Sequence, residues 1–275
     1  MHEFDTPEPP RIRVRNPAGQ IVVEASEGNR TTVELEPLRD DDTTREAIER
    51  ARVEAHGNEV IVEVGELRGF GIGGISISFG RTPQVGIRIR CPEGTELDCA
   101  TASANLKASG RLGDVEAKSA SGDVAVEHVT ALRVQSASGD VRAARIDGEA
   151  RIQTVSGDVR VGPVSGAISA TLVSGDFQAD EGQSDVTVKS VSGDLRVDAV
   201  REGEIKLQSV SGDVRLGVRP GTRLQIDATS TSGDISSELD VKDRPSELPS
   251  GLEARLQVKT VSGDVDIVRA APAAA

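Results

Sequence analysis

The sequence predicts an all-β protein, a single parallel β-solenoid of about 18-residue turns with Ser-Gly-Asp tripeptides at the corners. Three observations support this fold. The tripeptide recurs at nearly constant spacing, apolar residues stand at fixed offsets from it, and polar residues alternate with them. We expect a right-handed solenoid, because crossovers between parallel strands are almost always right-handed.

The Ser-Gly-Asp repeat is the main sequence signal. It occurs eight times, at intervals of 17, 18, 18, 18 and 19 residues that then widen to 21 and 30. A near-constant period of this size is typical of one supersecondary unit stacked on itself. The copies begin at Ser121, Ser138, Ser156, Ser174, Ser192, Ser211, Ser232 and Ser262.

Apolar columns within the repeat predict the strands. In every copy the residue after the Asp is apolar, and so are the residues four and six positions before the Ser. The residue between those two is polar, which is the alternation of a half-buried strand. We therefore expect inward residues of one turn to stack on those of the next: Val159, Val161, Ile152 and Ile168 on Phe177, Ala179, Ala170 and Val186.

The alternation changes phase inside the tripeptide. Ile152 and Thr154 share one face, and Val159 resumes that face only after an odd number of residues. The chain must bend between them. Glycine permits unusual backbone angles, and the oxygens of Ser and Asp can accept neighbouring N–H groups, so the tripeptide is interpreted as a corner.

The N-terminal part, residues 1–100, is expected to be a capping region that covers the exposed end of the coil. It holds a first degenerate repeat, Ala18-Gly19-Gln20, preceded by Ile12 and Val14 in the offsets of the repeat. A second degenerate copy, Ser103-Ala104-Asn105, follows. Between them the pattern predicts a helix over 43–55, a Gly-rich loop over 65–74, and strands near 59–64, 75–79 and 85–90.

Residues 101–269 are expected to form the solenoid repeats. A loop over 238–251, containing Pro245 and Pro249, is interpreted as an insertion that bulges from the penultimate turn and widens the last interval. Residues 270–275 are predicted to be a disordered tail.

Four parts of the sequence can be compared with known repeat proteins: Phe4-Asp5-Thr6-Pro7, Asn16-Pro17-Ala18-Gly19, the central Ser-Gly-Asp copies, and Thr260-Val261-Ser262-Gly263-Asp264-Val265. They resemble a bacterial family of β-strand repeat proteins of unknown function whose members are often labelled "putative adhesin". The resemblance covers nearly the whole chain and implies the solenoid fold but little chemistry.

Charge and composition exclude several partners. The formal net charge of −13 repels phosphate backbones, so nucleic acid is not an expected partner. The sequence has no apolar run of about 18 residues and no basic segment followed by an apolar one, so we expect a cytoplasmic protein that does not insert into a membrane. Cys91 and Cys99 are too few for a disulfide framework and are expected to be reduced and buried.

The aspartates of the repeat are the clearest candidate for a ligand site, because acidic residues on successive turns can chelate Ca²⁺. Arginines stand two residues after four of them, on the same outward face, and can offset their repulsion. We therefore favour a structural corner without bound metal, and cation binding stays the alternative. The candidate cation column is Asp140, Asp158, Asp176, Asp194 and Asp213, and the arginines are Arg142, Arg160, Arg196 and Arg215.

No catalytic residue or cofactor site is predicted. The only histidines, His2, His56 and His128, suggest no triad, and the chain lacks Trp and Tyr, which usually form sugar-binding platforms. Residues 69–74 match the glycine spacing of a dinucleotide-binding loop, but the alternation after them predicts a strand instead of the required helix. We interpret this loop as a surface feature whose Phe70 and Ile72 could dock a partner.

These features predict a non-enzymatic intracellular scaffold or protein-interaction module that binds a protein partner or another copy of itself. The alternative is a ligand-binding module that uses the aspartate column for cations or its surface for glycans.

Overall fold

The computed structural model describes residues 1–65, 82–239 and 253–270. The described chain is all-β apart from one short helix, as predicted. It divides into two compact units, Met1–Asp140 and Val141–Ala275. Strand β7 (Glu96–Ser119) runs as one continuous strand through residue 100, where the sequence analysis places the end of the capping region.

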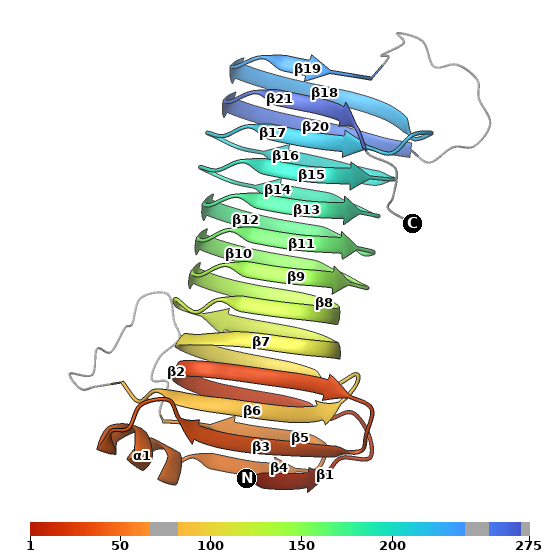
Figure 1. Ribbon diagram of the computed structural model, residues 1–275. Helices are drawn as coiled ribbons and strands as arrows, with labels where there is room; N and C mark the ends of the chain where they lie inside the picture. Colours follow the sequence, from red (N-terminus) through yellow and green to blue (C-terminus); the bar gives the residue numbers. More distant parts are fainter. Residues whose placement is uncertain (66–81, 240–252, 271–275) are drawn as a thin grey trace. The chain divides into compact units, whose positions relative to one another are not determined.

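The first unit consists of parallel strands with an antiparallel N-terminal border (Figure 1). Its elements are β1 (His2–Asp5), β2 (Arg11–Ser26), β3 (Arg30–Pro37), α1 (Asp42–Glu49), β4 (Arg52–His56), β5 (Glu59–Glu63), β6 (Val85–Pro92), β7 and β8 (Val124–Ser138).

The two degenerate repeats of the first unit pair as the sequence predicts. Strands β2 and β7 run parallel, with Gly19 opposite Ala104 and Ile21 opposite Leu106. Cys99 lies opposite Val14 and is buried. The register inferred from the apolar columns is therefore confirmed, even where the tripeptide has lost its Ser and Asp.

The order of strands in space differs from their order in the chain. Strand β2 pairs with β7 on one side, and on the other it pairs in parallel with both β5 and β6, where Val60 faces Ile12 and Ile87 faces Ile21. The first repeat of the chain is thus enclosed between two later segments. Strands β3 and β4 then pair antiparallel with β6 and β5, respectively, and β1 pairs antiparallel with β3.

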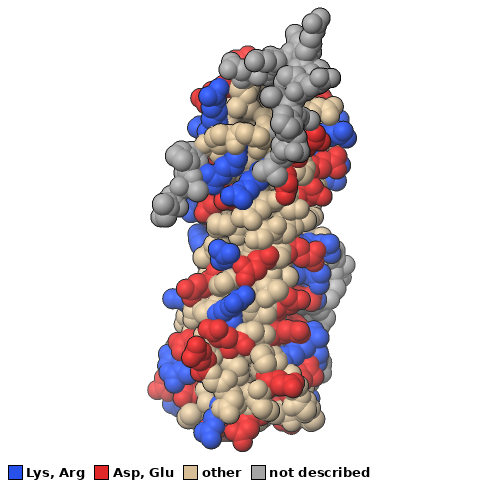
Figure 2. Space-filling view, turned by 90° about the vertical axis from the view of Figure 1, so that its right-hand side faces the viewer, with Lys and Arg blue, Asp and Glu red and all other residues tan. Residues whose placement is uncertain are grey.

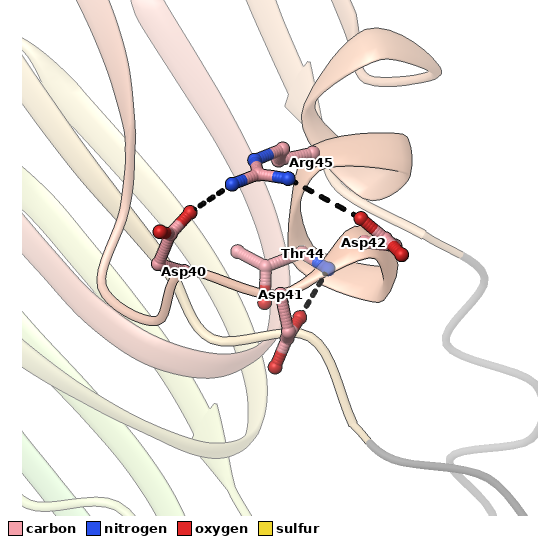
Figure 3. A network of polar contacts seen from close by, with 5 residues as sticks. All are labelled: Asp40, Asp41, Asp42, Thr44 and Arg45. Carbon is pink, nitrogen blue, oxygen red and sulfur yellow. Dashed lines mark hydrogen bonds and ion pairs between the residues drawn. The ribbon is translucent and has the colours of Figure 1, made fainter.

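Helix α1 begins where predicted but ends earlier. Asp41 is its N-cap: the Thr44 N–H donates to Asp41 Oδ1 at 2.7 Å, and Arg45 pairs with Asp40 and with Asp42 (Figure 3). The helix ends at Glu49, not at residue 55, because Arg52–His56 pair as strand β4 with β5. Sheet pairing overrides the helical propensity of this segment.

The second unit is a stack of coils, each made of two strands joined by a Ser-Gly-Asp corner. Parallel pairing joins each coil to the next. Its elements are β9 (Val141–Ile146), β10 (Ala150–Ser156), β11 (Val159–Val164), β12 (Ile168–Ser174), β13 (Phe177–Gly182), β14 (Val186–Lys189), β15 (Leu195–Val200), β16 (Gly203–Gln208), β17 (Val214–Val218), β18 (Arg223–Ser232), β19 (Ile235–Ser237), β20 (Glu253–Ser262) and β21 (Val265–Arg269).

The predicted stacking of inward residues is confirmed. All of these side chains are at most 2% exposed, so they form the apolar interior of the coil. The observed pairs are Val159 with Phe177, Val161 with Ala179, Ile152 with Ala170, and Ile168 with Val186.

The last two coils are exchanged in space. Strand β16 pairs with β20, and β20 pairs with β18, so the coil that comes last in the chain lies between the two that precede it. The partner strands follow the same order, β17–β21–β19. The segment predicted as an insertion over 238–251 stands in the chain between β19 and β20, and most of it lies outside the described residues.

The outer coil is less buried than the inner ones. Ile235 on β19 is 47% exposed, whereas Val265, its partner on β21, is fully buried. Ala270, which the sequence assigns to a disordered tail, is 6% exposed and donates its N–H to Val218 O at 2.9 Å, because it extends β21 along β17. Residues 271–275 of that tail lie outside the described residues.

Because the two cysteines are buried, we expect the protein to lose stability at alkaline pH. Burial raises the pKa of Cys91 to about 11 and that of Cys99 to about 12, from an ordinary 9.0. Unfolded thiols ionise near the ordinary value while the folded ones stay neutral, so their contribution is full below pH 9 and is lost as pH rises toward 11 to 12. Each thiol should contribute a slope of at most about 1.4 kcal/mol per pH unit. Urea unfolding at pH 8 to 11 of the natural chain and of Cys99→Ala should show the smaller slope in the variant, and equal slopes would contradict the assignment.

Candidate interaction surface

The Ser-Gly-Asp corners continue the hydrogen-bond ladder through the bend. The Gly193 N–H donates to Ser211 O at 3.0 Å, and the Ser211 N–H donates to Val191 O at 3.0 Å. The same two bonds recur between neighbouring coils of the second unit, for example from Gly212 to Ser262 and from Ser262 to Val210. The corners are therefore rigid, regularly spaced parts of the sheet.

Glycine is required at these corners for two reasons. Gly193 has a φ of +128°, a region that side chains other than glycine rarely adopt. A Cβ atom at this position would also lie 2.2 Å from Gly175 O of the neighbouring coil. Gly212 and Gly263 combine a positive φ with an equally close approach. The corners of adjacent coils therefore touch through backbone atoms.

Six of the corner aspartates accept the backbone N–H of the aspartate on an adjacent coil. The Asp194 N–H donates to Asp176 Oδ1 at 2.9 Å, and the Asp213 N–H donates to Asp194 Oδ1 at 2.8 Å. A charged acceptor strengthens such a bond. The same contact joins Asp140 to Asp123, Asp176 to Asp158, Asp264 to Asp213, and Asp234 to Asp264.

One arginine that the sequence suggests as a partner of a corner aspartate pairs with another residue in the structure. Arg196 Nε donates to Asp198 Oδ1 at 2.5 Å, on its own strand, and not to the corner Asp194. The arginines do form an outward column, in which Arg160 lies opposite Arg142 and Arg215 opposite Arg196. At Asp194 the backbone amide, more than an arginine, holds the carboxylate.

The described ranges contain no group of three or more His, Cys, Asp or Glu side chains arranged to hold a metal ion. The corner aspartates form a single file, so each potential site would offer few of the six to eight oxygens that Ca²⁺ takes. Geometry therefore favours the structural role of these carboxylates over cation binding.

A calcium titration tests this role. We expect the melting temperature to change by less than about 2 °C between excess chelator and millimolar calcium, because a ligand stabilises only the state that binds it. Differential scanning fluorimetry with an extrinsic dye measures this, since the chain has no Trp. A rise of many degrees with calcium but not with magnesium would favour the cation-binding alternative.

The other candidates from the sequence do not form a site in the described residues. His2 lies on β1, His56 ends β4 with its Nε2 3.7 Å from Glu54 Oε2, and His128 lies on β8. Phe70 and Ile72 lie outside the described residues. None of the helical segments that the structure describes is long and apolar enough to cross a membrane.

A column of exposed valines was missed by the sequence analysis. Five valines directly before a corner Ser lie on the outward face and are 46–52% exposed. Because the last coil lies inside the outer one, these valines occupy five consecutive coils. The sequence signal was present, since Val precedes Ser in five of the eight copies. The valine column consists of Val155, Val173, Val191, Val210 and Val261.

Charged side chains border the valine column on both sides. The residues two positions before the valines form an outward column of their own. This column includes Lys189 and Lys259, which lie on either side of Gln208 on the intervening coil. On the other side are the corner aspartates. Within the described part of the chain, neither lysine forms an ion pair, and the same holds for Asp176, Asp194, Asp213 and Asp264. The column is thus an apolar line between a partly cationic and an anionic edge.

Elsewhere the charges are mixed. In the view of Figure 2, acidic and basic side chains lie interspersed among uncharged ones. Among the described ion pairs, Glu181 holds two arginines: its carboxylate lies 3.0 Å from Arg201 Nε and 3.1 Å from Arg219. The visible face therefore offers no extended surface of a single sign that would attract a polyanion.

Corner tripeptides, in-register parallel strands and an antiparallel N-terminal border define a class of repetitive β-coil proteins. Residues 11–268 match the family described as Toastrack DUF4097, and the chain belongs to this family. The resemblance inferred from the sequence is thereby confirmed.

Several solved structures of bacterial proteins match this chain over nearly their whole length. A "putative adhesin" from Parabacteroides distasonis is 8% identical with a TM-score of 0.43, over 96% of this chain and 95% of that one. A "putative adhesin" from Bacteroides fragilis is 13% identical with a TM-score of 0.37, over 97% and 95%. A "putative lipid binding protein" from P. distasonis is 14% identical with a TM-score of 0.34, over 98% and 96%. A comparison with curated proteins gave no match.

Proposed function

We propose that this protein is a non-enzymatic protein-interaction module, a rigid scaffold that binds a protein partner through the valine column. The observation that carries the proposal is the continuous line of five half-exposed valines on adjacent coils. Burial of apolar surface contributes about 25 cal/mol per Å², so a line of this kind is a favourable place for a partner to bind.

The rigidity of the face supports the same proposal. Each valine is followed by a corner Ser, and for Val173, Val191 and Val210 the carbonyl accepts the N–H of a Ser on the neighbouring coil. A partner would therefore order little flexible backbone when it binds, which lowers the entropic penalty of association. Regular spacing of about 4.8 Å also suits an extended, repetitive partner.

Strand propensity alone does not explain the valines. The residue directly before the corner Ser is Ala120 in the first copy and Ala137 in the second. In the outer coil it is Thr231. The corner therefore forms without a β-branched apolar residue. Cross-strand valine contacts within one chain would contribute some stability, and the experiment below is designed to separate this contribution from binding.

Site-specific photocrosslinking in the native host tests the proposal. A photoreactive amino acid replaces Val191, and in a matched control it replaces Arg160, an exposed residue on the outward side of β11. We expect a discrete covalent adduct at position 191 and much less at 160. Equal labelling at both positions, or none at 191 in a folded protein, would contradict the proposal.

A further inference from the structure

We propose that the partner of the valine column is a second copy of this chain, and that two copies pack face to face about a two-fold axis parallel to the column. This inference rests on the proposed function and names its partner. Two-fold dimers are the commonest oligomers of soluble proteins, and their interface must be complementary to itself.

The order of columns across the face provides this self-complementarity. The lysine-containing column lies on one side of the valines and the corner aspartates lie on the other. Rotation by 180° about an axis along the valine column exchanges the two sides. Valine then meets valine, and the lysines of each copy face the corner aspartates of its partner.

The charges that would meet are available. Lys189 and Lys259 form no ion pair among the described residues, and the same is true of Asp194 and Asp264, the corner aspartates of their own coils. The bond that each of these carboxylates accepts from a backbone N–H uses Oδ1. Lysine has a long, flexible side chain that can reach a carboxylate across an apolar line.

Spacing and orientation also agree. Both charged columns have one position per coil, about 4.8 Å apart, so they remain in register along a parallel dimer. The alternative two-fold axis, perpendicular to the column, would place lysine near lysine and aspartate near aspartate. Like charges in contact disfavour that arrangement, so the charges select the parallel dimer.

The oligomeric state of the full chain is the first test. Sedimentation equilibrium is measured at about 0.15 M salt, where the Debye length of about 8 Å limits the effect of the net charge of −13. We expect a dimer for the natural chain. The double variant Val191→Thr and Val210→Thr keeps β-branched side chains, and Thr231 occurs naturally at this motif position.

We expect the dissociation constant of this double variant to be at least tenfold higher than that of the natural chain. At concentrations where both proteins are monomeric, we expect the two to have the same melting temperature. A natural chain that stays monomeric, or a double variant that dimerises as tightly as the natural chain, would overturn the inference. A merely structural role of the valines would lower the monomer melting temperature and leave association unchanged.

Disulfide trapping tests the orientation. In the parallel dimer every coil faces its own copy, so Val173→Cys should form a disulfide with itself. With the perpendicular axis, Val173→Cys would instead pair with Val210→Cys in a mixture of the two variants, and that result would overturn the parallel arrangement. Cys91 and Cys99 are at most 2% exposed and do not compete.

The two proposals can fail separately. A monomeric chain whose probe at Val191 captures only other proteins would refute self-association and leave the interaction module standing. A monomeric chain with no adduct at that position would refute both.

Discussion

Replacing Gly193 with valine should destabilise the protein by at least about 3 kcal/mol and prevent folding at physiological temperature. The added Cβ would meet Gly175 O at 2.2 Å, and the residue would have to hold a φ of +128°. The neighbouring atoms are backbone atoms of a hydrogen-bonded corner, so they cannot move without breaking the ladder. Circular dichroism during urea unfolding measures the change.

Two matched variants separate the causes of this effect. Gly221 also has a positive φ, +88°, but a Cβ there would meet nothing within 4 Å, so Gly221→Val should report backbone strain alone and cost clearly less. Asp194→Asn keeps an oxygen that can accept the Asp213 N–H, and should change stability by less than about 1 kcal/mol. Equal losses in Gly193→Val and Gly221→Val would contradict the close approach of the corners.

Replacing Val159 with aspartate should cost several kcal/mol, because it places a carboxylate in the apolar interior. Val159 is 0% exposed and lies between Val141 and Phe177 of the adjacent coils. Arg151→Ser is the control, on the outward face of β10, and should remain within about 0.5 kcal/mol of the natural chain. Melting shifts of the same size in the two variants would contradict the assignment of inward and outward faces.

The sequence predicted the coil and its register because an exact tripeptide marks eight of the turns. Alignment on Ser-Gly-Asp places Ile152 and Val159 correctly, and even the degenerate Ala18-Gly19-Gln20 pairs as expected. Each column position determines one face of a strand, so a register error of one residue would have exposed the whole apolar set. This redundancy explains the success of the fold prediction.

The exchange of the last two coils could not be predicted in the same way. Ile226 and Leu256 are equally apolar, and either could stack on Ile205. The choice depends on tertiary packing at the end of the stack, where Ile235 stays partly exposed. Likewise, the helix was predicted to run to residue 55 from local helix propensity. Local propensity carries no information on the pairing of β4 with β5, which ends the helix earlier.

The valine column was overlooked for a different reason. The apolar columns that predict the core occupy inward positions, whereas a valine directly before a corner Ser has the parity of the outward face, where polar residues are expected. The right-handedness of the coil, a single solenoid through both units, and the cytoplasmic location stay predictions.

The valine column is continuous because Val261 lies on the coil next to that of Val210. Spin labels on cysteines at 208 and 259 should be neighbours, with Cα atoms about 4.8 Å apart, whereas labels at 208 and 229 should be separated by about twice that distance. Electron paramagnetic resonance line broadening compares the two pairs directly. Stronger broadening for 208 with 259 is the predicted result, and stronger broadening for 208 with 229 would mean that the coils follow chain order and that the column is interrupted by Thr231.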